Sequence, residues 1–166
     1  MIRDEYLAAM SRAANSVTVV TTDGPAGKVG VTVSAMCSVS VDDQSATLLV
    51  CVHELSPARA AITENGVFCA NLLGDDQMHV SDSFAGRSGA SGVDKFNCGE
   101  WAQLATGAPA LVGALASFDC RLRERYQVGT HHIFIGEIQC VDSTEGCSPL
   151  IYHDRRYRRM ETQLLA

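Results

Sequence analysis

Small side chains dominate the segment Gly30–Ser40, which reads GVTVSAMCSVS. Val31 and Val33 alternate with small or polar residues, a pattern that is typical of a β-strand. Short side chains on a strand let a flat ligand approach the backbone, whose N–H and C=O groups can bind the polar edge of a ring. The pattern fits equally a closely packed strand whose Ser and Thr side chains face water, so the segment leaves both interpretations open.

A second candidate for chemistry is the predicted start of a helix at Ser56. Ser56 and Pro57 favour the N-cap and the first helical position, and Gly66 favours the end of the helix. The free N–H groups of a helix start favour an anion, to which Ser56 could add a hydroxyl and Arg59 a positive charge. The alternative is an ordinary N-cap beside a solvated arginine.

Two glycine-containing segments carry further polar groups. Phe84-Ala85-Gly86-Arg87 leads into Ser88-Gly89, and such a loop either folds over a ligand or is an ordinary connection. Gly129-Thr130-His131-His132 enters an apolar strand. Neighbouring strand residues point to opposite faces, so only one of the two histidines can face a given pocket. The other histidines are interpreted as incidental; they are His53, His79 and His153.

Strands are the main elements that must position these groups. The patterns predict a helix over 3–13, strands over 16–22, 28–41, 47–52 and 67–73, two long strands over 114–126 and 131–141, and a short strand over 150–153. Short helices are predicted over 56–66 and 75–84. Connections that are mainly hairpins favour an antiparallel barrel over βαβ units. One domain over 1–166 is expected.

The composition narrows the classes of function. The chain has 166 residues, of which 46% are hydrophobic, enough for one core. Its net charge of −6 argues against nucleic acid as a partner, because such binding depends on many Lys and Arg contacts. The longest uncharged stretch, 29–41, is too short and too polar to span a membrane, and no secretory signal is recognised at the N-terminus. A cytoplasmic protein is therefore expected.

Seven cysteines are spread along the chain, mostly among apolar neighbours, and they are interpreted as buried small hydrophobic residues. None of them forms a C-x-x-C pair, and the histidines do not lie beside them at ligand spacing. No metal site is expected.

Taken together, these segments resemble the short-chain flavin reductase family, the reductase components of two-component flavin-dependent monooxygenases. The resemblance covers nearly the whole chain and is strongest toward the reductases of 4-hydroxyphenylacetate 3-monooxygenase and of the pyrimidine-utilisation monooxygenase. It rests on short segments in a specific order: Val19–Gly27, Gly30–Ser40, Leu48–Cys51, Phe68–Leu73, Phe84–Gly86, Ser117–Cys120, Gly129–His131 and Leu150–Tyr152.

The resemblance implies a mainly β fold, the FMN-binding split barrel, which is a Greek-key antiparallel β-barrel with short flanking helices. Barrels of this family pair into homodimers with flavin sites near the subunit interface. The implied activity is that of an NAD(P)H-dependent flavin reductase, which transfers a hydride from NADH or NADPH to FMN or FAD. Reduced flavin would then diffuse to a partner oxygenase, and no side chain is expected to act as a nucleophile.

The same resemblance implies two groups of binding residues. The flavin would be bound by Thr32, Val33, Ser34, Ala35, Met36, Cys37 and Ser38 along the ring, Ser56 and Arg59 at the phosphate, and Phe84, Ala85, Gly86 and Arg87 above it. The nicotinamide nucleotide would be placed by His131, Tyr152 and Arg155. Ala58 stands where the family often has a second hydroxyl, so phosphate binding would depend more on Arg59 and on backbone donors.

Two other functions stay open at this point. A split barrel could bind a flavin or another flat cofactor without turnover, in which case bound flavin would not be accompanied by NADH oxidation. A pyridoxamine-phosphate-oxidase-like enzyme could use the same barrel, but it would need a denser basic cluster for its substrate phosphate than the sequence contains.

Overall fold

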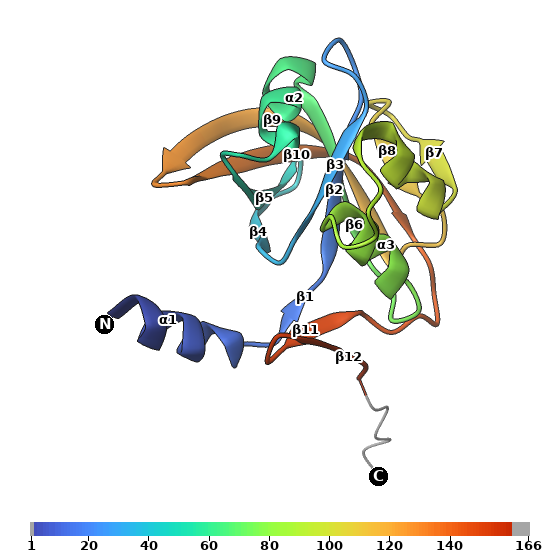
Figure 1. Ribbon diagram of the computed structural model, residues 1–166. Coiled ribbons are helices and arrows are strands. Elements are labelled where there is room, and N and C mark those ends of the chain that lie inside the picture. The colour runs from blue at the N-terminus through green and yellow to red at the C-terminus, as the bar shows by residue number, and fades with distance from the viewer. Residues whose placement is uncertain (1, 161–166) are drawn as a thin grey trace.

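A seven-stranded antiparallel sheet forms the centre of the computed structural model, which describes residues 2–160. The strand order is β3-β2-β6-β9-β10-β5-β4, and Figure 1 shows these strands curling around a common interior. Their bounds are β2 Thr18–Thr22, β3 Val29–Val33, β4 Met36–Val41, β5 Ala46–His53, β6 Val67–Leu72, β9 Ala116–Val128 and β10 His131–Ser143. The prediction of a mainly β fold with antiparallel hairpins is confirmed.

The interior of the barrel is filled from the strands and from helix α2 (Pro57–Asn65). Phe68 and Phe134 are fully buried there and pack in one cluster with Ile62 of α2. Ser56 caps α2 with its side chain, and Gly66 ends the helix in the left-handed region at φ 69°. These are the start and stop signals that the sequence predicted for this helix.

A second apolar cluster lies beside the barrel, under helix α3 (Met78–Phe84) and the 3₁₀ helix η1 (Gly92–Cys98). The ring of Phe84 packs edge to face against Phe96 and Trp101, with centroid distances of 4.9 and 5.5 Å. A small hairpin of β7 (Trp101–Gln103) and β8 (Pro109–Leu111) closes this side. The sequence did not predict η1, β7 or β8, because glycines and prolines in and around these short elements are typical of turns and loops.

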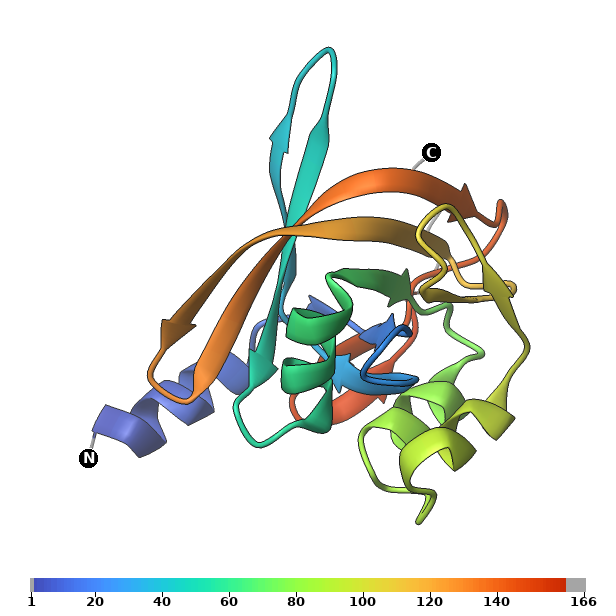
Figure 2. The ribbon, with the colours of Figure 1, turned by 90° about the horizontal axis from the view of Figure 1, so that it is seen from above.

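Segments near the two ends of the described chain pair outside the barrel. Strand β1 (Asn15–Ser16) pairs with β11 (Ile151–His153), which pairs with β12 (Arg156–Arg158). Helix α1 (Ile2–Ser11) buries none of its residues and projects away from the barrel in Figure 1. The hairpin of β9 and β10 extends on the same side as α1, as Figures 1 and 2 show. No helix within residues 2–160 combines the length and the apolar character needed to cross a bilayer.

The prediction of one continuous strand over 28–41 is wrong. β3 ends at Val33 and pairs with β2, whereas β4 begins at Met36 and pairs with β5 at the other edge of the sheet. The break at Ser34 and Ala35 has a physical cause, since one strand segment follows the curved sheet at one edge and the next has to join the opposite edge. This break lies at the centre of the candidate site.

Candidate flavin site

Two adjoining depressions open beside the break between β3 and β4, and they share Thr32, Val33 and Ser34 as a common wall. We call this set of three residues the shared wall. The depressions have volumes of about 200 and 230 Å³, so together they lie within the range of about 300–1,000 Å³ that is usual for small-molecule sites. Short side chains on the shared wall leave the backbone accessible to a planar ring, and on this ground the residues present fit a flavin.

Backbone polar groups at the break are available for such a ring. Neither Ser34 nor Ala35 has a register partner among the described strands. The carbonyl oxygen of Ala35 accepts a 3.1 Å hydrogen bond from the N–H of Cys51, which holds the break against β5. The Thr32 hydroxyl donates a 2.7 Å bond to the carbonyl oxygen of Ser81, which holds the shared wall against α3. The wall is thus fixed from both sides.

The first depression is the arginine depression, which Ala85, Arg87, Tyr152 and Tyr157 line together with Val17, Ser81 and the shared wall. Arg87 Nη1 donates to Asp82 Oδ1 at 3.3 Å, and the guanidinium carbon lies 6.0 and 5.8 Å from the ring centroids of Tyr152 and Tyr157. Contact with Tyr152, followed by the neighbouring Tyr157, raises the pKa of Arg87. The depression therefore carries a permanent positive charge that two aromatic rings and a carboxylate hold in place.

The second depression is the histidine depression, which Ala35, Cys51, His53 and His131 line together with Val31 and the shared wall. His53 of β5 and His131 of β10 are direct cross-strand partners, and their rings meet edge to face with centroids 4.9 Å apart. Burial raises the pKa of the Cys51 thiol, so this thiol is neutral at pH 7. The polar groups offered to a ligand here are therefore the two imidazoles and the backbone.

The start of α2 lies one turn along the chain from His53. The N–H of Ser56 donates to the carbonyl oxygen of His53 at 2.9 Å, while Ser56 Oγ accepts from the N–H of Ala58 at 3.3 Å. Arg59 Nε donates to the carbonyl oxygen of Glu54 at 3.5 Å. Ser56 is thus an N-cap, as one interpretation of the sequence had it. Binding of a phosphate by Ser56 and Arg59 stays a prediction.

Several predicted site residues do not reach these depressions. Met36, Cys37 and Ser38 line a separate apolar cavity with Phe118 and Ile138, because β4 has already crossed to the other edge of the sheet. Phe84 is only 2% exposed, so its ring supports the loop from below and cannot cover a ligand. Gly86, at φ 76°, and Arg155, at φ 59°, occupy turns and line neither depression.

Of the lining residues that the sequence analysis does not assign to the site, two carry a ring with a polar group, His53 and Tyr157. His53 was interpreted as incidental, yet it faces His131 in the histidine depression. Tyr157 lies opposite Tyr152 across the β11–β12 turn. A signal existed for Tyr157, since Tyr152 and Tyr157 flank Asp154-Arg155 symmetrically, as cross-strand partners flank a two-residue turn. No local signal existed for His53, whose partner lies 78 residues further along the chain.

Comparisons with known proteins agree with this architecture. The model of the flavin reductase like domain family matches residues 10–161. A relative from Methylorubrum extorquens (strain PA1), named FMN reductase (NADH) RutF 1, is 44% identical over 155 residues, which cover 93% of this chain and 75% of the relative.

Solved structures give the same result. BorF, the flavin reductase component of a bacterial two-component tryptophan halogenase, superposes with a TM-score of 0.86 at 32% identity, covering 97% of this chain and 99% of BorF. SgcE6, an NADH:FAD oxidoreductase from Streptomyces globisporus C-1027 in complex with NAD and FAD fragments, has a TM-score of 0.87 at 26% identity, covering 98% and 94%. The split-barrel prediction is confirmed, and the chain belongs to the flavin reductase like domain family.

Proposed function

We propose that the chain is a flavin reductase that transfers a hydride from NADH to FMN and then releases the reduced flavin to a partner monooxygenase. The observation that carries the proposal is the shared wall, along which two depressions adjoin. A planar ring laid on this wall contacts short side chains and backbone and keeps one face open for a second ring. The activities named for two relatives, FMN reductase (NADH) and flavin reductase component of a halogenase, support the same chemistry.

In this proposal, different residues of the site bind the flavin ring, the flavin phosphate and the nicotinamide. The shared wall and Ala35 hold the flavin ring, Arg87 and Ala85 bound it on one side, and Ser56 with Arg59 receives its phosphate. His131 places the nicotinamide on the other side. Tyr152 lies with Arg87 and not with His131, so its proposed role is to hold the arginine depression.

The reaction needs no nucleophile from the protein. The C–H bond at C4 of the nicotinamide breaks, its electron pair and hydrogen pass to N5 of the flavin, and solvent supplies the proton that completes the reduced flavin. The contribution of the chain is to bring the two rings to reacting distance in the right orientation. Backbone N–H groups at Ser34 and Ala35 would stabilise the negative charge that the flavin gains.

The choice of substrates is part of the proposal. FMN and NADH are favoured, because the Methylorubrum relative is named an NADH-dependent FMN reductase. FAD is the alternative flavin, because SgcE6 is an NADH:FAD oxidoreductase whose structure contains FAD fragments. Rates with the four pairs of FMN or FAD and NADH or NADPH would decide between them.

We also propose a homodimer and a cytoplasmic location. α1 exposes Tyr6 and Met10, and β4 exposes Val39 and Val41, with exposed fractions between 47% and 77%. Contiguous exposed apolar patches mark surfaces that bind another chain, and we propose that these two elements form such a surface. All seven cysteines are free, which suits a reducing compartment. Sedimentation analysis of the purified protein would test the dimer.

The decisive experiment is to follow NADH absorbance with purified protein, first without flavin and then after FMN is added. Oxidation that depends on both protein and FMN is the expected result. Stoichiometric, tight flavin binding with unchanged NADH would indicate a flavin-binding protein without turnover. If the protein neither oxidised NADH nor bound flavin, the proposal would be refuted.

A further inference from the structure

Two histidines from strands far apart in the sequence share the wall of the histidine depression. His53 is the last residue of β5, and His131 is the first residue of β10. Their rings lie edge to face, with an interplanar angle of 83° and centroids 4.9 Å apart. This is the geometry that aromatic rings prefer when the positive edge of one meets the face of the other.

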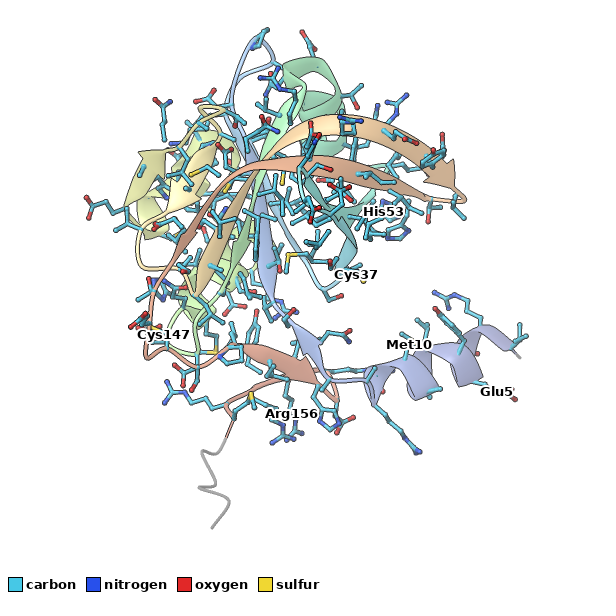
Figure 3. The ribbon with its side chains drawn as sticks, turned by 180° about the vertical axis from the view of Figure 1, so that it is seen from behind. Glu5, Met10, Cys37, His53, Cys147 and Arg156 are labelled. Carbon is cyan, nitrogen blue, oxygen red and sulfur yellow. The ribbon has the colours of Figure 1, made fainter. Side chains whose placement is uncertain are left out.

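His53 is the fixed member of this pair. Its Nδ1 accepts a 3.1 Å hydrogen bond from the N–H of Leu55, and its carbonyl oxygen accepts one from the N–H of Ser56. Both bonds belong to the turn that joins β5 to α2. The ring is half-buried, and in Figure 3 His53 lies beneath the two long strands, on the side of the barrel that faces α1. Its orientation is therefore set by the body of the barrel.

His131 is the less constrained member. It is exposed and follows the Gly129-Thr130 turn at the tip of the β9–β10 hairpin, which projects from the barrel in Figure 2. Its Nδ1 lies 3.2 Å from Oγ1 of Thr130, a residue of the same turn. The contact with His53 links the His131 ring to the body of the barrel.

We propose that His53 is a positioning residue for NADH use: it orients the imidazole of His131 toward the nicotinamide side of the site. The inference rests on the proposed function and deepens it, because His53 acts through His131 and not through the flavin. The ring of His53 provides the contact, and its Nδ1 provides the orientation of that ring.

Two substitutions separate these contributions. His53→Asn keeps a side-chain acceptor for the N–H of Leu55, since Asn forms this bond to the residue two positions on, but it removes the ring. His53→Phe keeps a ring against His131 and removes the acceptor. We expect His53→Asn to raise the KM for NADH about three- to tenfold, the loss of one aromatic pair, with kcat and the Kd of FMN changed less than about twofold. His53→Phe should recover most of this loss.

A double-mutant cycle tests whether His53 acts through His131. Once His131→Ala has removed the partner ring, adding His53→Asn should leave the KM for NADH unchanged, because the contact is already gone. An equal rise of KM in both backgrounds would show that His53 acts on its own and would overturn the inference. A loss with His53→Phe as large as with His53→Asn would overturn it too, because the ring would then not be the active part. His79→Ala, which removes an exposed imidazole from α3, is the matched control. It should change neither the KM for NADH nor the Kd of FMN.

NMR makes the result independent of turnover. The His131 ring-proton signals, assigned by their absence in His131→Ala, should shift in His53→Asn and stay in place in His79→Ala. A wild-type protein that does not oxidise NADH while this shift is present would refute the proposed function and leave the contact established. Signals that do not shift would refute the contact, whatever the activity.

Discussion

The hydroxyl of Tyr157 donates a 2.8 Å hydrogen bond to Asp82 Oδ1, and Ser81 Oγ lies 2.9 Å from the same hydroxyl. These contacts join β12, the last described strand, to α3. Arg87 Nη1 lies 3.3 Å from both the Tyr157 hydroxyl and Asp82 Oδ1. One phenol therefore connects the C-terminal hairpin, the helix and the charged group of the arginine depression.

Tyr157→Phe should weaken the hold on Arg87 in this depression without removing the arginine from it. The ring that packs against Arg87 stays, whereas the bond to a carboxylate is lost. Asp82 is about one-third exposed and Arg87 about half exposed, so solvent screens much of the effect. We expect the free energy of unfolding to fall by about 1 kcal/mol and the Kd of FMN to rise about threefold, measured by urea denaturation and by flavin fluorescence quenching.

Tyr126→Phe is the matched control for Tyr157→Phe. Tyr126 also donates to a carboxylate, that of Glu124, but it lies on β9 outside both depressions. Its loss should leave the Kd of FMN unchanged. If the two variants weakened FMN binding equally, the Tyr157 hydroxyl would not be holding the site.

Gly30→Ala should destabilise the protein, because a Cβ at this position would lie 2.5 and 2.7 Å from two carbons of the Phe84 ring. The Phe84 ring packs against Phe96 and Trp101, so it can move aside only by disturbing these contacts. Overpacking of this kind costs about 1–3 kcal/mol, and the displaced ring would shift the loop that carries Ala85 and Arg87. Urea denaturation gives the cost, and FMN binding reports the shift of the loop.

Removing part of the Phe84 ring provides the internal control. In Phe84→Leu the Cε1 carbon, which would lie nearest to a Cβ at residue 30, is absent, so Gly30→Ala should cost less in that background than in the wild type. Additive costs would mean that Phe84 is not what excludes a side chain at residue 30.

Local signals in the sequence were sufficient for much of the fold. Ser56, Pro57 and Gly66 fixed the bounds of α2 because capping depends on nearby residues only. The strand interruption at Ser34-Ala35 was not predicted, because nothing local distinguishes a β3 that pairs with β2 from a β4 that pairs with β5. Pairing between distant strands is decided by the closure of the whole barrel.

In the candidate site, too, the parts that depend on local sequence could be predicted and the parts that depend on distant strand pairing could not. The shared wall could be predicted from short side chains in one segment. The family resemblance places Met36 to Ser38 on the same small-residue strand, whereas in the structure they follow the break and line another cavity. His53 and His131 become neighbours through the register of β5 and β10, which a single sequence does not reveal.

His132 should make the protein less stable in mild acid. Burial, followed by the charges of Arg125 and Arg59, lowers its pKa from the ordinary value of 6.5, against a smaller opposing effect of Glu54. As the pH falls through about 6.5, the unfolded chain binds a proton that the folded chain does not, so stability falls with pH below that value. His132→Phe should flatten the decline between pH 7 and pH 5 in urea denaturation, relative to wild type. An equally steep decline in the variant would contradict this assignment.

Asn71→Asp should be among the most destabilising single-atom changes in the chain, and its effect should depend on pH. Asn71 is fully buried: its Oδ1 accepts from the N–H of Leu111 and the hydroxyl of Ser117, and its Nδ2 donates to the carbonyl oxygen of Val19. A carboxylate keeps the acceptors but faces that carbonyl oxygen unprotonated, at a cost of about 3 kcal/mol or more. Burial would raise the pKa of the new carboxyl group above its unfolded value, so stability is lost as the pH rises and part of the deficit should disappear between pH 7 and pH 5. Asn97→Asp, on the exposed side of η1, should change the free energy of unfolding by less than about 0.5 kcal/mol. An equal, pH-independent effect of both substitutions would show that the Asn71 amide is not needed as a donor.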